Sequence, residues 1–152
     1  HLSKEVMGMV DDIVNSICHD LDAYMSYIDG VLSNTQEPVT DRELDDFVMN
    51  LSSLLYFVSD KQEKLGVEAD VSHAVYREVY NKARELASGT VADKNTAADL
   101  AAQNEYIIYT VKSRAYKIIK SKVEAGYEMV TSIKKVLTRR ITEYGITNSD
   151  IT

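Results

Sequence analysis

The sequence contains few of the residues that interrupt helices. Among its 152 residues there are one proline, six glycines and no tryptophan. Proline and glycine mark most turns and strand ends, so their scarcity argues against a fold of many short strands. The composition favours long helices.

Cysteine and long apolar runs are also nearly absent. Cys18 is the single cysteine, which excludes a disulfide within the chain and favours a reducing compartment. No apolar run approaches the roughly 18 residues of a membrane-spanning helix, and no charged and apolar leader precedes a small-residue cleavage site. We therefore expect a cytoplasmic protein without a membrane partner.

Positive charge is scarce in the first part of the chain and concentrated at its end. Residues 1–111 hold 8 Lys and Arg against 20 Asp and Glu, whereas residues 112–152 hold 9 against 4, which gives the net charge of −7. Such a division is typical of a basic surface that contacts either an acidic part of the same chain or a charged partner. A solvated helix face rich in Lys and Arg is the simpler interpretation.

The periodicity of apolar residues predicts an amphipathic first helix. These residues recur at steps of three and four from Val6 to Val31, which indicates a helix over about residues 4–33. A polar segment with the only proline, Pro38, follows and ends this helix.

A second and a third helix are predicted on either side of a short turn. The capping-box signature of Thr40 and Glu43 begins a helix over about residues 41–87. Its continuity through Gly66 is left open, because glycine weakens a helix interior. Ser88-Gly89 supplies a stop at which we expect a positive φ at the glycine.

The third helix is predicted over about residues 90–144. Thr90 and Asp93 give it a start with an acid in the first turn. Gly145 is expected to end it, and residues 147–152 are expected to form a disordered tail.

These elements predict an all-α fold with a single domain over residues 1–152. The short turn makes the helices 41–87 and 90–144 antiparallel neighbours, and the helix 4–33 packs on this hairpin. Because the first helix is shorter than the hairpin, part of the apolar surface stays uncovered. We therefore expect a homo-oligomer.

Two enzyme interpretations are weaker than structural ones. His19-Asp20 and His73 lack the further ligands that a metal-dependent phosphohydrolase needs. Glu43 and Asp46 give one carboxylate pair of a nucleotide pyrophosphohydrolase without a second pair, and helix capping explains Glu43 more simply. We expect neither a catalytic nor a metal site, and no cofactor.

The C-terminal cations give the strongest functional pattern. Tyr109 and Tyr116 lie among them, and aromatic rings can stack bases while cations meet phosphates. Half-buried core positions are the usual alternative for such tyrosines. The predicted nucleic-acid-binding cations are Lys112, Arg114, Lys117, Lys120, Lys134, Lys135, Arg139 and Arg140. The same cations could instead contact an acidic patch, which comprises Asp41, Glu43, Asp45 and Asp46.

The C-terminal half resembles a phage protein family. The phrases that carry the resemblance lie within about residues 70–143 and are Tyr106–Tyr109, Tyr116–Lys120, Ser132–Lys135 and Arg139–Ile141. They resemble the UvsY-like recombination mediators. The resemblance implies a helical oligomer in the host cytoplasm that binds single-stranded DNA and helps to load a recombinase.

Three functional hypotheses result. The first is a non-enzymatic, oligomeric accessory protein of phage-like DNA metabolism that binds single-stranded nucleic acid. The second is a protein-binding module whose acidic patch contacts a host defence or replication protein. The third is a sponge that holds a small nucleotide at an oligomer interface.

Overall fold

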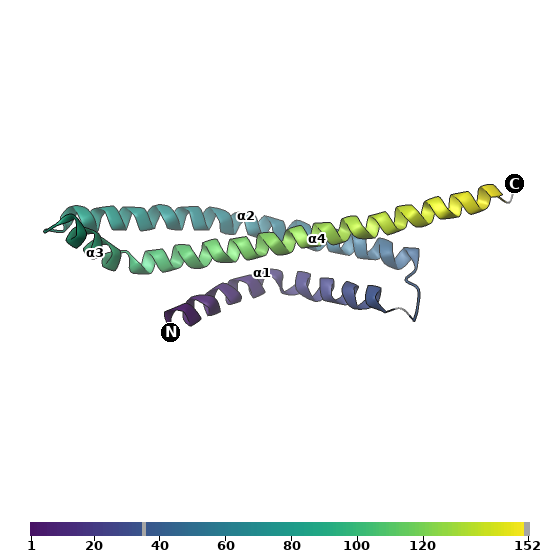
Figure 1. Ribbon diagram of the computed structural model, residues 1–152, viewed down its shortest axis with the longest axis horizontal. Helices are drawn as coiled ribbons and strands as arrows, with labels where there is room; N and C mark the ends of the chain where they lie inside the picture. The colour runs from purple at the N-terminus through teal and green to yellow at the C-terminus, as the bar shows by residue number, and fades with distance from the viewer. Residues whose placement is uncertain (35, 151–152) are drawn as a thin grey trace. The chain divides into compact units, whose positions relative to one another are not determined.

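The computed structural model describes residues 1–34 and 36–150, with side chains described as far as Gly145 (Figure 1). No described residue lies in a strand, so the predicted all-α fold is confirmed. The described helices are α1 (Leu2–Ser33), α2 (Asp41–Leu86), α3 (Val91–Ala101) and α4 (Gln103–Asp150).

Local hydrogen bonds explain where α2 and α3 begin. The Glu43 N–H donates to Thr40 Oγ1 at 3.1 Å, and the Thr40 hydroxyl donates to Glu43 Oε1. At α3 the Asp93 N–H donates to Thr90 Oγ1, and the Thr90 N–H donates to Asp93 Oδ2 at 3.0 Å. This second bond lowers the pKa of Asp93 below its ordinary 3.8, because it favours the carboxylate. Both predicted helix starts are confirmed.

Gly66 does not interrupt α2. The helix is continuous from Asp41 to Leu86, and the Tyr116 ring lies against the glycine. A Cβ at residue 66 would stand 2.9 Å from Tyr116 Cε2. The absence of a side chain at Gly66 therefore lets the ring of α4 approach the backbone of α2.

The predicted third helix differs from the structure at two places. It is divided at Ala102, whose φ of −101° and ψ of 11° separate α3 from α4. No glycine or proline marks this point, and the methyl groups of Ala98 and Ala102 are both fully buried there. Packing rather than a helix-breaking residue therefore sets the path of the chain.

The second difference is at the C-terminal end. The predicted stop at Gly145 is wrong, because α4 continues to Asp150. Glycine ends a helix by adopting a positive φ, and among the described residues only Gly89 does so. Of the predicted disordered tail, residues 147–150 continue α4, and residues 151–152 lie outside the described part of the chain.

The chain divides into two compact units that share α1, α2 and α4. The first unit comprises residues 1–17 and 60–120, and the second comprises residues 18–59 and 121–152. The prediction that these residues act as one domain stays a prediction.

In the first unit, α2 and α4 are antiparallel neighbours. Glu68 faces Lys112 and His73 faces Tyr109, so residue numbers rise along one helix as they fall along the other. The core is lined mainly by small side chains, which allow helices to approach closely. Its buried apolar residues are Val10, Val14, Leu65, Ala69, Ala98, Ala102, Val111, Ala115 and Ile119.

In the second unit, three helix segments surround a core of larger side chains. The Tyr24 hydroxyl of α1 accepts a hydrogen bond from Asn50 of α2, and the Tyr24 and Phe47 rings meet edge to face. Gly126 of α4 lies against Leu55 of α2. The buried apolar residues are Cys18, Leu21, Ile28, Leu44, Phe47, Leu51, Leu55, Val58, Val123, Val130 and Ile133.

The turn between α2 and α3 provides a test of the fold. Gly89 has a φ of +111°, and a Cβ there would lie 2.7 Å from Asp93 Oδ2. We expect Gly89→Val to lower the free energy of unfolding by about 1 kcal/mol or more, because a β-branched residue resists a positive φ. Urea unfolding followed by circular dichroism measures the change.

Gly8→Ala is the matched control. Gly8 lies inside α1, and a Cβ added there would have no neighbour within 4 Å, so alanine should stabilise the helix by about 0.5–1 kcal/mol. If Gly89→Val unfolds at the same urea concentration as the parent, the positive φ does not constrain the turn.

Candidate nucleic-acid interface

All nine Lys and Arg residues after residue 111 lie on α4. Three of them contact carboxylates of other helices within their own unit, and the others are exposed. The predicted nucleic-acid-binding cations therefore differ in their surroundings.

Lys112 and Lys122 are directed toward neighbouring helices. In the first unit, Lys112 Nζ lies 3.7 Å from Glu68 Oε2 of α2. In the second unit, Lys122 Nζ donates to both oxygens of Asp22 in α1, at 2.9 and 3.0 Å. Both lysines are half-buried, and each already has a negative partner.

Cys18 lies beside the Lys122 pair. Its side chain is fully buried. Burial raises the pKa of the Cys18 thiol, the negative charge of Asp22 raises it further, and Lys122 acts in the opposite direction. A buried thiol with a raised pKa is a core group rather than a nucleophile.

Arg140 connects α4 to the start of α2. Its Nη1 donates to the Val39 carbonyl at 2.7 Å and to Asp41 Oδ1 at 2.8 Å. The structure thus brings one residue of the acidic patch to one predicted cation. Arg140 is half-buried and has a structural role in the second unit.

The other cations of the second unit are differently placed. Lys134, Lys135 and Arg139 are exposed, and none of them pairs with a carboxylate among residues 1–34 and 36–145. Lys135 and Arg139 are four residues apart, so their charges are neighbours on the helix surface. These three residues form a group that we name the exposed cation group.

The exposed cation group has acidic residues of α4 on both sides, because the exposed Glu143 follows Arg139 by four residues. Glu124 and Glu128 are exposed earlier on α4 in the same unit. Glu128 is seven residues before Lys135, about two helical turns, so both side chains lie on the same side of α4. Negative charge therefore lies beside the exposed cation group on its N-terminal side along α4.

In the first unit, Arg114, Lys117 and Lys120 are also exposed on α4. Each of these cations is three residues from the next, so consecutive ones lie next to each other on the helix surface. All three side chains reach solvent, as the sequence predicts for this part of the basic run.

The two predicted tyrosines pack against α2. The Tyr109 ring centroid lies 4.7 Å from that of His73, and the Tyr116 ring lies against Gly66. Both tyrosines are half-buried, which is the usual state of tyrosine at helical spacing. His73 is not among the predicted site residues, although the antiparallel pairing of the helices places it opposite Tyr109.

Tyr76 and Tyr106 form a further ring pair in the first unit, with centroids 5.3 Å apart. Burial raises the pKa of Tyr76, and the negative charge of Asp99 raises it further. A carboxylate at this place disfavours a phosphate. The ring pair is therefore a poor nucleic-acid contact.

Two exposed tyrosines of α4 lie on either side of the exposed cation group. Tyr127 is 50% exposed and Tyr144 is 74% exposed. Tyr127 precedes Lys134 by seven residues, which puts the ring and the cation on the same side of the helix. Neither ring is among the predicted site residues, because tyrosines are more frequent over residues 106–116. The spacing of seven residues between Tyr127 and Lys134 is nevertheless visible in the sequence.

The acidic patch is not one surface of equivalent residues. Asp41 pairs with Arg140, and Glu43 takes part in the cap of α2. Asp45 and Asp46 are exposed and have no ion pair within residues 1–34 and 36–145. Of the four residues in the acidic patch, only these two are available to contact a protein partner, as the protein-binding hypothesis requires.

Metal ligands do not converge in the part of the chain that the structure describes, where no three His, Cys, Asp or Glu residues could hold one ion. His19 Nδ1 and Asp20 Oδ1 are 3.2 Å apart on the exposed surface. No described helix is long and apolar enough to cross a membrane.

Comparison of the chain with protein-family models, curated proteins and solved structures gives no match.

The different roles of neighbouring cations can be tested by stability. Arg140→Gln should lower the free energy of unfolding by about 1 kcal/mol, because it removes a charged hydrogen-bond donor from a half-exposed pair. Lys135→Gln should leave stability unchanged or raise it by about 0.2–0.5 kcal/mol, because it removes a like-charge neighbour of Arg139. Urea unfolding of the two variants measures the difference, and equal stabilities would contradict the structural role of Arg140.

Proposed function

We propose that the chain is a non-enzymatic accessory protein that binds single-stranded nucleic acid through α4 of its second unit. The observation that carries the proposal is the exposed cation group. Asp and Glu outnumber Lys and Arg by 24 to 17 in this chain, yet Lys134, Lys135 and Arg139 have no carboxylate partner within residues 1–34 and 36–145. An external anion is the partner that suits them.

Electrostatic repulsion within the group supports an anionic partner. Lys135 and Arg139 repel each other at a spacing of four residues, at a cost of about 0.2–0.5 kcal/mol. A phosphate placed between them would replace this repulsion with attraction. Phosphate contacts from Lys and Arg supply most of the affinity of sequence-independent nucleic-acid binding.

The exposed rings support a single strand rather than a duplex. Tyr127 and Tyr144 are accessible on the same helix as the cations. In a single strand the bases can turn away from each other and stack on such rings, at about 1–3 kcal/mol per base. The proposed site therefore comprises the exposed cation group and Tyr127, with Tyr144 at its C-terminal side.

The family resemblance suggests the wider role. A UvsY-like mediator would hold DNA as an oligomer and help to load a recombinase, in the host cytoplasm if the gene belongs to a phage. Ile141 follows Arg140 on α4 and is 70% exposed, so it offers an apolar side chain that a second copy of the chain could cover. Recombinase loading and oligomerisation are therefore parts of the proposed nucleic-acid-binding function.

Removing the exposed cation group tests the proposal. The triple variant Lys134→Gln, Lys135→Gln, Arg139→Gln should bind a fluorescent oligo-dT more weakly than the parent. Its plot of log affinity against log salt should be flatter by about 0.7 for each phosphate that the protein no longer neutralises, hence by about 2 for three. Helicity should persist, because Gln is nearly as good a helix former as Lys or Arg. Fluorescence anisotropy at several salt concentrations measures both quantities.

A matched triple variant controls for net charge. Lys61→Gln, Lys64→Gln, Lys82→Gln removes three exposed lysines of α2, two of which pair with Asp60 and Glu78. This variant should keep the parent's salt dependence. If both triple variants lose affinity equally, or the parent does not bind oligo-dT at low salt, the proposed site is wrong.

A protein-binding module is the second candidate, and Asp45 and Asp46 favour it. Both are exposed and unpaired among the described side chains, and Met49 one turn later is 72% exposed. Acidic residues beside an exposed apolar side chain suit a basic protein partner. Stable binding to a basic protein, abolished in Asp45→Asn, Asp46→Asn, together with no affinity for oligo-dT, would favour this candidate.

A further inference from the structure

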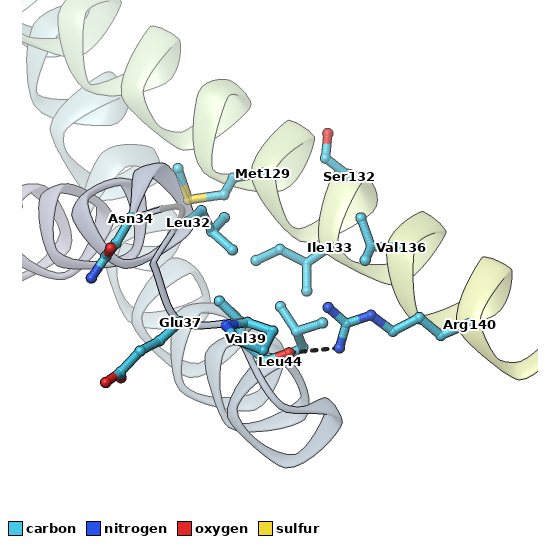
Figure 2. Close-up of a pocket in the computed structure, with 11 residues that line it drawn as sticks. Leu32, Asn34, Glu37, Val39, Leu44, Met129, Ser132, Ile133, Val136 and Arg140 are labelled. Atoms are coloured by element: carbon cyan, nitrogen blue, oxygen red, sulfur yellow. Dashed lines mark hydrogen bonds between the residues drawn. The ribbon is translucent and has the colours of Figure 1, made fainter.

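The second unit contains an apolar recess beside Arg140 (Figure 2). It has a volume of about 630 Å³ and lies among the end of α1, the segment before α2, the start of α2, and α4. Its volume falls within the range of about 300–1,000 Å³ that is usual for small-molecule sites. The recess is therefore large enough for an organic ligand.

The walls of the recess are aliphatic. Leu44 and Ile133 form its buried side, with 1% and 2% of their surfaces exposed. Leu32, Met129 and Val136 complete the apolar lining nearer to solvent. An aliphatic chain placed here would remove both its own surface and the surface of these side chains from water. This burial is favourable in proportion to the apolar area buried.

A single charged side chain faces this apolar surface. Figure 2 shows the guanidinium of Arg140 beside Ile133 and Val136, whereas the carboxylate of Glu37 and the amide of Asn34 point away from the recess. Asp41 Oδ1 lies 2.8 Å from Arg140 Nη1 and offsets part of the positive charge, so the guanidinium acts on a ligand mainly through its remaining N–H groups. A quaternary ammonium head group has no acceptor for these N–H groups, so it would gain nothing from Arg140.

Arg140 keeps hydrogen-bond donors for a ligand. A guanidinium has five N–H groups, and Nη1 uses its two on Val39 and Asp41. The N–H groups on Nε and Nη2 have no hydrogen-bond acceptor among residues 1–34 and 36–145. Adjacent donors of this kind match the two oxygens of a carboxylate.

We propose that this recess binds a small amphipathic carboxylate, with the aliphatic chain against Leu44 and Ile133 and the carboxylate on Arg140. The Asp41 pair does not prevent this, because it occupies a different nitrogen of the same guanidinium. The proposal is independent of nucleic-acid binding, since Arg140 is not part of the exposed cation group. Either one can fail without the other.

Isothermal titration calorimetry with decanoate, below its micelle concentration, tests the proposal on the full chain. Decanoate should bind one site per chain, decanol should bind more weakly, and decyltrimethylammonium should bind weakest. Arg140→Gln should weaken decanoate binding about tenfold or more, because it removes a charge-assisted pair, and should leave decanol binding unchanged. This contrast separates the head group from the aliphatic chain.

Two further variants distinguish the loss of the site from the loss of the fold. Val136→Phe adds a ring to the wall without removing the charge, and should weaken decanoate and decanol alike. Arg42→Gln removes an exposed arginine that does not line the recess, and should leave decanoate affinity unchanged. The proposal is overturned if decanoate does not bind, if either Arg140→Gln or Val136→Phe binds it as the parent does, or if decyltrimethylammonium binds as tightly as decanoate.

Discussion

One helix, α4, has to bury an apolar stripe and carry nine cations at the same time. Its periodicity decides which of these cations meet the acidic residues of the same unit. Lys122 and Arg140 are eighteen residues apart, which is five turns of about 3.6 residues. They therefore lie on one side of the helix, and both contact carboxylates in the second unit. Lys134, Lys135 and Arg139 are rotated away from that side and remain exposed.

The ion pairs and the apolar core have different effects. Burial of residues such as Leu21, Leu51 and Leu55 supplies the main stabilisation of the second unit. The pairs of Lys122 and Arg140 are partly exposed, so each adds at most about 1 kcal/mol to the free energy of unfolding. Their effect is positional, because each links a particular residue of α4 to a particular residue of α1 or α2. The same pairs leave fewer cations for an external partner than the sequence suggests.

The sequence predicts the helices better than the site. Helix starts follow from side chains within a few residues of each other, such as Thr90 and Asp93, and the positive φ of Gly89 follows from its residue type. The division at Ala102 depends on packing around two buried methyl groups, which no local residue signals. Gly145 has the residue type of a helix stop, but the helix continues through it.

For the candidate site, the number of Lys and Arg residues in the sequence identifies α4. It does not show which of these cations are exposed and which are paired with a carboxylate. Lys112 and Arg140 look equivalent to their neighbours in the sequence, and only their contacts with Glu68 and Asp41 distinguish them. Tyr109 and Tyr116 lie near many cations in the sequence, yet they pack against α2. Facing residues across two helices are tertiary information, which the spacing along one helix does not contain.

The central claim is that α4 carries cations of two kinds, and the reactivity of individual lysines measures it directly. Brief acetylation followed by peptide mass spectrometry, with and without oligo-dT, compares Lys134 and Lys135 with Lys122. We expect Lys134 and Lys135 to react faster than Lys122 in the free protein and to be protected by oligo-dT. Lys122 should react slowly in both conditions, because it is paired and only 34% exposed. Fast reaction of Lys122, or bound oligo-dT that leaves Lys134 and Lys135 unprotected, would contradict the account.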